Sequence, residues 1–533
     1  MKTNNVLVST AGAKAMDEEA STQWGLNAFA LVEAAGRACA RAFSQMYAQE
    51  RRKMSFAVLA GKGNNAADAL VMLRALIIDG YAQASACSVF IPRVSESSGE
   101  KTPLAEAMLA VQKLGVPLMI WDVETAAGVL DKADVIIDGI VGTGLTGSLR
   151  GVALGMAEAI NIIGRRGGGG GSNDPYIVSI DVPSGSFDGW QSGMPMVEAH
   201  ATLAIEPRKI CLYMPAARPN AGTIIPVGGI FPPALIDKYR ETELVEWETA
   251  SAGIPPVSPS AYKYERGLVE IRAGSPGAAG AARLAALGAQ AAGAGLVRLM
   301  VDPSLYPVVA PDCSGIMVVP GGDTTESNRF SPNAVLLGPG WGRGEDRKRL
   351  LEAYLPLEER GVPLILDADA IALAKGIVFN GNALITPHPG EFAEYTGLSK
   401  DEILNCPLPA LRRCAGEQKV HILLKSHVLY AASPDGRVGI IDGMNPLLAA
   451  GGSGDVLAGF CAAVASRSGA SGNNASRQKP FDGYACACAA ASLLLRAAKS
   501  EGVAGAFVDP ADVARAAAAI AGAAWLPGQG GIA

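Results

Sequence analysis

The chain alternates short apolar runs with longer segments in which apolar residues recur every three or four positions. The longer segments of the first half, such as 68–79, 103–114 and 152–163, have the spacing of amphipathic helices. Strands that alternate with helices form parallel sheets with helices on both faces, so this half is predicted to be a doubly wound α/β domain. Its predicted strands are residues 55–60, 86–91, 117–121, 135–138 and 176–181.

The same alternation returns after a stretch that has neither pattern. Prolines, which oppose helix interiors and central strands, recur over 232–259 around a charged segment. We therefore predict two domains, 1–235 and 263–533, joined by a linker over 236–262. The second domain is again expected to be α/β. Its predicted strands are 268–273, 296–301, 334–337, 364–367, 383–386, 422–425 and 429–432.

The composition and net charge indicate which kinds of partner this protein is expected to bind. The 533 residues carry a net charge of −6, with 49% hydrophobic and 18% charged residues, which is the balance of a globular protein. A net negative charge gives no basic field for nucleic acid or an anionic membrane. We expect a cytoplasmic homo-oligomer that acts on a small molecule and binds neither nucleic acid nor membranes. The nine cysteines lack the spacing of a metal or disulfide site, so buried reduced thiols are expected.

Polar or glycine-rich loops follow predicted strands of the first half. They are GKGNNAAD at 61–68, DGIVGTG at 138–144 and DVPSG at 181–185. Ligands of doubly wound sheets bind beyond the carboxyl ends of the strands, so these loops should converge on one pocket. Taken alone, Asn64 and Asn65 are equally well explained by an ordinary turn. Lys209 follows an apolar run, but a lone lysine after a strand is usually solvated, and we leave it outside the predicted site.

The second half has loops of the same kind, at 338–342, 367–370, 386–391, 424–426 and 451–455. In the last of these, Gly451, Gly452, Ser453 and Gly454 lead into a helical pattern, and such a turn binds anions at a helix N-terminus. Asp455 would then be placed to take a proton from a hydroxyl that attacks a bound phosphate. The alternative is that Asp455 only caps the helix. Asp367 and Asp369 either bind a metal ion or brace the strand end.

The first half resembles the epimerase domain of the NAD(P)H-hydrate repair enzymes, which carry GxGNNGGDG, DxxxGTG and DxPSG loops. The resemblance implies a Rossmann-like fold, with Asp181 as the catalytic acid/base. It also implies a potassium ion held by Asn65, Asp138 and Ser184, since hard oxygen ligands suit such a cation. The substrate, a hydrated nicotinamide nucleotide, would be bound by Asn64, Asn65, Asp68, Gly142, Thr143 and Gly144.

This half departs from the family pattern where Ala66 and Ala67 replace glycines. We expect weakened epimerisation, because a Cβ disfavours the positive φ that glycine would allow there and occupies space beside the ligand.

The second half, with GPGWG, DADA, TPHPGE and GGSGD in this order, resembles the ADP- or ATP-dependent NAD(P)H-hydrate dehydratases, a branch of the ribokinase-like superfamily. The resemblance implies that Gly340 and His388 contact the hydrated nucleotide and that Asp455 is the catalytic base. Glu391 would order a magnesium ion through water. The phosphates of ADP or ATP would be bound by Lys425, Gly451, Gly452, Ser453 and Gly454.

Together these patterns favour a bifunctional repair enzyme: one domain interconverts the epimers of hydrated NADH or NADPH, and the other dehydrates one epimer at the expense of ADP or ATP. Two alternatives remain open. One is a kinase for a small vitamin-precursor alcohol, and the other is a non-catalytic nicotinamide-nucleotide-binding protein. The sequence does not distinguish ATP from ADP, or NADH from NADPH.

Overall fold

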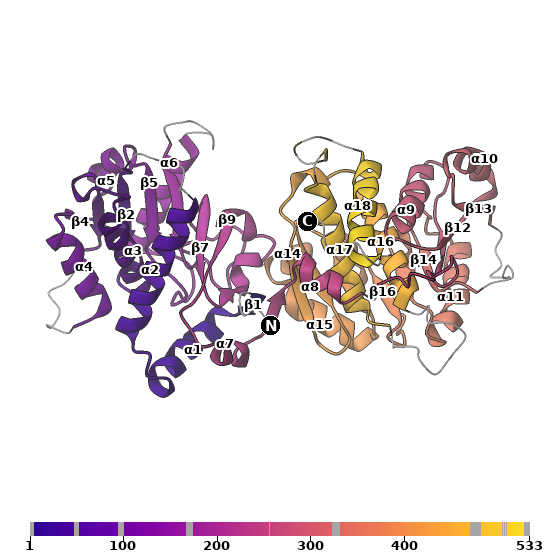
Figure 1. Cartoon of the computed structure of the whole chain (residues 1–533), viewed down its shortest axis with the longest axis horizontal. Helices are drawn as coiled ribbons and strands as arrows, with labels where there is room; N and C mark the ends of the chain where they lie inside the picture. The colour runs from indigo at the N-terminus through magenta and orange to yellow at the C-terminus, as the bar shows by residue number, and fades with distance from the viewer. Residues whose placement is uncertain are drawn as a thin grey trace. The chain divides into compact units, whose positions relative to one another are not determined.

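The structure is a computed structural model that describes residues 5–46, 53–93, 101–166, 174–254, 256–321, 331–468, 481–500, 502, 503, 505, 507 and 509–526. The chain forms two compact units, Met1–Glu243 and Leu244–Ala533, whose elements are labelled in Figure 1. The division falls within the segment expected to be a linker. That segment is not an extended connection, because it contains strand β10 (Thr242–Leu244) and helix α8 (Trp247–Ala252).

The first unit is built on a sheet of order β4-β3-β2-β5-β6-β7-β9 in which all neighbours are parallel. All the predicted strands of this half are present, and β7 and β9 extend the sheet beyond them. The strands are β2 (Phe56–Ala60), β3 (Ser88–Ile91), β4 (Leu118–Ile120), β5 (Val135–Gly139), β6 (Tyr176–Ile180), β7 (Ala201–Ile205) and β9 (Thr223–Val227).

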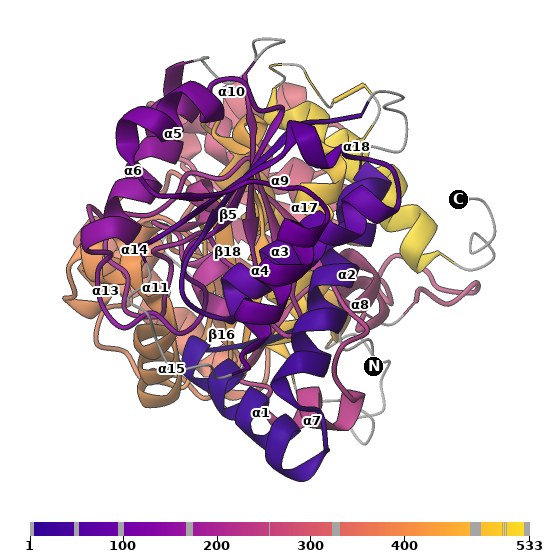
Figure 2. The ribbon, with the colours of Figure 1, turned by 90° about the vertical axis from the view of Figure 1, so that its left-hand side faces the viewer.

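Helices cover both faces of this sheet, as predicted for a doubly wound fold. Figure 2 shows α2 (Ala28–Met46), α3 (Asn64–Ile78) and α4 (Pro103–Lys113) on one side of β5, and α5 (Val123–Leu130) and α6 (Gly151–Arg166) on the other. Alternate residues of the strands divide between two hydrophobic cores: Val58 packs with the first group of helices, and Leu59 with the second.

A smaller layer closes one end of the first unit. Strand β1 (Val6–Val8) pairs parallel with β8 (Arg208–Lys209) and antiparallel with β10. Helix α1 (Thr10–Gln23) follows and packs through Met16 against Leu235 of α7 (Pro233–Lys238). Residues 24–27 separate α1 from α2.

The second unit has a sheet of order β13-β12-β11-β14-β15-β16-β17-β18-β19. Its neighbours are parallel from β13 to β17, and the last three strands form antiparallel pairs. The predicted strands are again present, with β13 and β19 in addition. The strands are β11 (Leu268–Arg272), β12 (Leu296–Val301), β13 (Met317–Pro320), β14 (Ala334–Leu337), β15 (Leu364–Leu366), β16 (Ala383–Ile385), β17 (His421–Leu424), β18 (Val428–Ala432) and β19 (Val438–Asp442).

Helices rich in alanine and glycine share a core with one face of this sheet: α9 (Ala279–Ala291), α16 (Ser453–Ser468), α17 (Gly483–Ala498) and α18 (Pro510–Trp525). The small residues let α9 and α16 approach closely. A Cβ at Gly459 would lie 2.1 Å from Ala285 O, and one at Gly288 would lie 2.4 Å from Val456 O. This contact fixes the start of α16, where the GGSGD turn lies.

The remaining helices of the second unit are α10 (Tyr306–Val309), α11 (Glu345–Glu359), α12 (Asp369–Leu373), α13 (Pro389–Thr396), α14 (Lys400–Asn405) and α15 (Pro407–Gln418). Tyr354 of α11 accepts a hydrogen bond from Arg272 Nε of β11 (2.5 Å), on the sheet face opposite to the one that Val269 and Ile271 present to the alanine-rich helices.

No helix in the described part of the chain is long and apolar enough to cross a membrane. All nine cysteines lie in that part and none is in a disulfide. Eight are buried as expected, and Cys406 is exposed.

Candidate functional sites

A cavity of about 500 Å³ lies beyond the carboxyl ends of β2, β5, β6 and β7 in the first unit. The convergence expected of the three loops is therefore present. Every substrate-binding residue predicted in this half lines the cavity, together with Asp181: Asn64, Asn65, Asp68, Gly142, Thr143 and Gly144.

Lys209 also lines this cavity, which corrects the expectation that it is solvated. Its side chain is buried, and Nζ donates to Asp181 Oδ1 (2.6 Å) and to Ile205 O (3.0 Å). The reason is topological, because β8 follows β7 at the same end of the sheet as Asp181. Asp181 itself has a φ of +66°, a left-handed backbone conformation that costs about 1–3 kcal/mol and is typical of functional sites.

Two further carboxylates face the Asp181–Lys209 pair. Asp68 of α3 is buried, and this burial, with the charges of Asp181 and Asp17, raises its pKa well above the usual range. Asp17 of α1 is partly exposed to solvent. Burial of the rest of its carboxyl group by the surrounding protein raises its pKa to about 6. Lys209 opposes both shifts. The site therefore holds more acid groups than its buried cation can neutralise.

The structure does not support the reason given for weakened epimerisation. Ala66 and Ala67 lie in the first turn of α3, are fully buried, and do not have a positive φ. A helix begins at Asn64 because the glycine-rich turn ends at Gly63, so the two methyl groups pack into the core below the loop. No left-handed conformation is lost by having alanine at these positions.

Asp138 and Ser184 lie behind the cavity wall and are fully buried. Asp138 Oδ1 accepts from Ser184 Oγ (2.5 Å) and Ile140 N (3.2 Å), and Oδ2 accepts from Ser179 Oγ (2.7 Å) and Ser184 N (2.9 Å). Burial raises the pKa of Asp138, and the hydrogen bonds oppose that shift. The network ties the DGIVGTG loop to the DVPSG loop.

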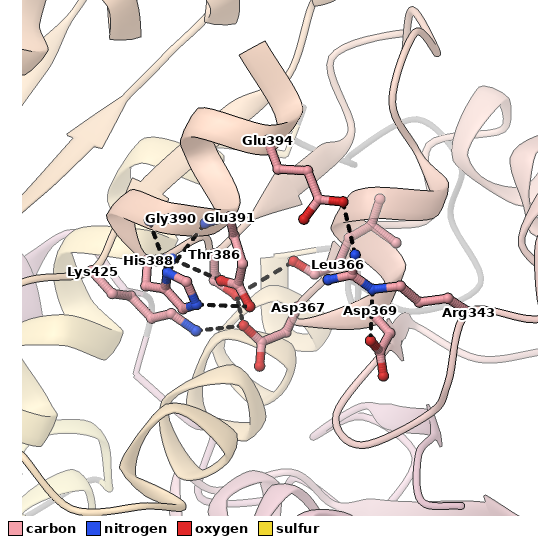
Figure 3. A network of polar contacts seen from close by, with 10 residues as sticks. All are labelled: Arg343, Leu366, Asp367, Asp369, Thr386, His388, Gly390, Glu391, Glu394 and Lys425. Atoms are coloured by element: carbon pink, nitrogen blue, oxygen red, sulfur yellow. Dashed lines mark hydrogen bonds and ion pairs between the residues drawn. The ribbon is translucent and has the colours of Figure 1, made fainter. Parts of the chain in front are cut away.

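In the second unit, the loop residues after β15, β16 and β17 converge (Figure 3). Lys425 Nζ donates to Asp367 Oδ1 (2.5 Å), which also accepts from Thr386 Oγ1 (2.7 Å). Burial works against the charge of Lys425, but Asp367, Glu391 and Asp455 raise its pKa. The contact with Thr386, which follows β16, corresponds to the bracing role considered for Asp367.

Asp455 lies in the first turn of α16, beside this ion pair. Burial raises the pKa of Asp455 to about 6; the charges of Asp367 and Glu391 add to the shift and Lys425 opposes it. A carboxylate that only capped the helix would gain hydrogen bonds to the charged form, which lower a pKa. The raised pKa of Asp455 therefore gives no sign of capping hydrogen bonds, and its role as a base stays a prediction.

The turn before Asp455 presents backbone rather than side chains. Gly452 has a φ of +99°, and a Cβ at Gly454 would lie 3.3 Å from Lys425 Nζ. Ser453 Oγ donates to Leu448 O (2.9 Å) and Ala450 O (3.0 Å), so this hydroxyl fixes the turn. The amides of Gly454 and Asp455 lack intrahelical acceptors by their position, and these amides can bind an anion.

His388 and Glu391 form the start of α13. His388 Nδ1 accepts from Gly390 N (2.9 Å) and Glu391 N (3.1 Å), and Glu391 Oε2 accepts from His388 N (2.8 Å). In this reciprocal capping box the imidazole is exposed, and its Nε2 lies 3.5 Å from Glu391 Oε1. Both residues thus stand at the rim of the site beside Lys425.

The GPGWG loop lies on the other side of Asp367. Gly340 has a φ of +56°, and a Cβ there would lie 2.7 Å from Ala278 Cβ, so only glycine fits. Asp369 accepts from Gly342 N (2.8 Å) and Arg343 Nε (3.0 Å), and Arg343 also donates to Glu394 Oε1 (2.8 Å; Figure 3). Asp369 therefore anchors this loop.

Both halves of the chain match families of known proteins. Residues 269–510 match the family model described as NAD(P)H-hydrate dehydratase, and residues 28–211 match the one described as YjeF-related protein N-terminus. The bifunctional NAD(P)H-hydrate repair enzyme Nnr of Salinibacter ruber is 30% identical over 85% of this chain and 86% of that protein. The chain belongs to the family of bifunctional NAD(P)H-hydrate repair enzymes.

Other members of the repair-enzyme family match to a similar extent. The enzyme of Gloeobacter violaceus is 32% identical over 83% of this chain and 85% of its own length, and that of Escherichia coli is 28% identical over 89% and 86%. Among solved structures, the ADP/ATP-dependent NAD(P)H-hydrate dehydratase from Bacillus subtilis, co-crystallized with ATP/Mg2+, is 23% identical, with a TM-score of 0.46 over 52% of this chain and 97% of that chain.

Two residues of the repair-enzyme site were missed from the sequence. Lys209 was rejected for lack of a partner, although its place just after a strand at the sheet end that carries Asp181 was a usable signal. Asp17 gave no signal, because an acid on an amphipathic helix normally marks its solvated face.

The donors around Asp138 fit a potassium ion by their chemistry. The Asn65 side chain, the Asp138 carboxylate and the Ser184 hydroxyl all offer oxygen, and Asp138 and Ser184 are fully buried beside the cavity that Asn65 lines. These three residues would hold the ion.

A magnesium ion fits the second site only indirectly. Within the described ranges, no group of three His, Cys, Asp or Glu side chains is arranged to hold a metal ion directly. Asp367, Glu391 and Asp455 together outweigh the charge of Lys425, and this excess negative charge suits a hydrated divalent cation held through water.

Proposed function

We propose that this chain repairs hydrated nicotinamide nucleotides: the first unit interconverts the epimers of NAD(P)H hydrate, and the second dehydrates one epimer in a reaction that consumes ADP or ATP. The observation that carries the proposal is the environment of Asp455. A carboxylate with a raised pKa, beside amides that can bind an anion and a largely buried lysine, is what phosphoryl transfer to a hydroxyl requires. Membership of the repair-enzyme family supplies the substrate class.

Dehydration is difficult because hydroxide is a poor leaving group. Asp455 takes the proton of the substrate hydroxyl as its oxygen attacks the terminal phosphoryl group, and the amides of the α16 turn stabilise the charge on the phosphoryl oxygens. The phosphorylated oxygen then leaves as inorganic phosphate, and the neighbouring ring carbon loses a proton to solvent as the carbon–carbon double bond forms. Lys425 would contact the nucleotide phosphates, and its ammonium group is fixed by Asp367, which in turn accepts a hydrogen bond from Thr386. A magnesium ion held through water by Glu391 and its acidic neighbours would neutralise phosphate charge.

In the first unit, the cavity loops would bind the hydrated nucleotide, with Asp181 as acid or base beside Lys209. A potassium ion held by Asn65, Asp138 and Ser184 would supply a fixed positive charge behind the loops. A homo-oligomer and a cytoplasmic location also belong to this proposal, and size-exclusion chromatography and cell fractionation test them.

Phosphate release tests the dehydratase activity. The purified chain is incubated with hydrated NADH or NADPH and either ADP or ATP, while phosphate and the recovered NAD(P)H absorbance are measured together. Substrate-dependent release in step with NAD(P)H recovery is expected. Phosphoryl transfer to a small vitamin-precursor alcohol, without response to the hydrates, would instead establish the kinase alternative.

A further inference from the structure

The cavity of the first unit contains more carboxyl groups than its chemistry has so far used. Asp17, Asp68 and Asp181 line it together with the buried cation Lys209. The catalytic role considered so far falls on Asp181 alone, yet a reaction that returns its substrate unchanged except for the configuration of one carbon must both remove and return a proton. An acid and a base are needed at the same time.

The hydrogen bonds divide the acids between these two roles. Lys209 Nζ donates to Asp181 Oδ1 at 2.6 Å, with both side chains buried, so the charged form of Asp181 has a cationic partner. Asp68 has no such partner. Its Oδ1 is buried and makes no hydrogen bond within the described residues. A buried oxygen without a partner costs more free energy when the group is charged than when it is neutral.

The surroundings of Asp68 act in the same direction. The titratable or charged groups that face it are Asp17 of α1, Cys39 of α2, Asp181 after β6 and Lys209 of β8, while Lys14, Lys62 and Glu206 also line the cavity. Lys209 is already paired with Asp181. The two nearest carboxylates repel a further negative charge, and burial removes the solvent that would stabilise it. Burial and these charges raise the pKa of Asp68 well above the usual range.

We infer that Asp68 is the general acid of the epimerase half and acts together with Asp181 as its general base. This inference rests on the proposed epimerase function. Two carboxyl groups in one site, one in an ion pair with a lysine and the other buried among like charges with an oxygen that makes no hydrogen bond within the described residues, can act as base and acid. Asp68 is then a catalytic residue rather than only a contact for the substrate.

The chemistry balances without a further reactant. Hydration of the dihydropyridine ring places the hydroxyl on the carbon next to the ring nitrogen. Asp181 takes the hydroxyl proton as the carbonyl forms and the carbon–nitrogen bond breaks, and the electron pair of that bond passes to nitrogen, which takes the proton of Asp68. Rotation of the freed carbonyl and the reverse steps close the ring on the other face and restore both carboxyl groups.

The test is the rate of interconversion of the separated epimers by the full-length chain, corrected for the uncatalysed rate, in Asp68→Asn. Asparagine keeps the size and hydrogen-bonding capacity of the side chain but cannot transfer a proton. We expect kcat to fall by about 10²–10⁴-fold with KM little changed. Asp79→Asn, at the exposed C-terminal end of the same helix, is the matched control and should keep the normal kcat. A normal kcat with a raised KM in Asp68→Asn would show a binding residue and overturn the inference.

A pH series supplies the second measurement. An acid works only while protonated, so the wild-type rate should fall as pH rises through the pKa of Asp68, and Asp68→Asn should lose this fall. Asp17→Asn removes a negative charge that faces Asp68, which lowers the pKa of Asp68 and moves the fall to lower pH. If Asp68→Asn does not fold, the Asp17→Asn profile decides, and an unshifted profile overturns the inference. If the wild-type chain did not interconvert the epimers at all, both the epimerase proposal and this inference would be overturned.

Discussion

At the scale of single residues, both sites use a buried lysine in the same way. In the first unit Lys209 pairs with Asp181, and in the second Lys425 pairs with Asp367. Each lysine satisfies one acid and leaves another, Asp68 or Asp455, among negative charges that favour its protonated form. Acids that look equivalent in sequence therefore differ in their surroundings, because the lysine of each site forms an ion pair with only one of them.

Asp455→Asn should abolish dehydration while nucleotide binding persists. Loss of a general base typically lowers kcat by about 10²–10⁴-fold, and asparagine preserves the shape of the turn. In the wild type the base must be charged, and its pKa is raised to about 6, so the rate should fall as pH drops through that value. Steady-state kinetics over a pH series checks the loss of kcat and the pH dependence. Isothermal titration calorimetry with the nucleotide checks that binding persists. Near-normal turnover in the variant would return Asp455 to a capping role.

At the scale of elements, the start of α3 explains why alanine is tolerated after Asn64 and Asn65. Restoring glycine at both positions, Ala66→Gly with Ala67→Gly, should destabilise the first unit without faster epimerisation. Glycine costs about 0.5–1 kcal/mol relative to alanine in a helix, and neither position has a positive φ that glycine would relieve. Thermal unfolding and epimer interconversion are the measurements. A faster double variant would restore the idea that the alanines weaken this half.

The N-terminus of α13 is capped by the side chain of His388, a role that Ser, Thr, Asp or Asn usually takes. His388→Ala should lower the stability of the second unit by about 0.5–2 kcal/mol, because Gly390 N and Glu391 N lose their acceptor. His388→Asn keeps an acceptor and should retain most of that stability. Thermal unfolding of the three chains compares them. Equal stability of the alanine and asparagine variants would mean that the cap contributes nothing.

At the scale of the whole molecule, each compact unit contains the residues of its own site. The cavity residues all lie between Ala13 and Phe231, and the Lys425 network lies beyond Leu244. Because neither site borrows a residue from the other unit, the full-length Asp455→Asn chain should interconvert epimers at the wild-type rate although it no longer dehydrates them. Both rates are measured on one preparation. A parallel loss of epimerisation would show that the two activities are coupled.

The sequence by itself determined the order of strands and helices, the two α/β units and the loops that carry chemistry. These follow from local patterns: apolar periodicity places strands and helices, and glycine-rich turns mark their carboxyl ends. The positions of Asn64, Asp181 and Asp455 at such ends were therefore predictable. The convergence of the loops within each unit was also predictable, because the carboxyl ends of parallel strands lie at one edge of a sheet.

Only the tertiary structure decided which of these groups are paired or buried, and therefore which have raised pKa values. The ion pair of Lys209 with Asp181 became known only once β8 placed the two 2.6 Å apart, and the part of Asp17 in the site only once α1 placed it beside the same pair. Likewise, alanine at position 67 was expected to weaken ligand binding. The structure shows instead that α3 begins at Asn64, three residues earlier, so that Ala67 is helical. Charge state and backbone conformation depend on neighbours that are distant in the chain, and a local pattern of residues does not contain their distances.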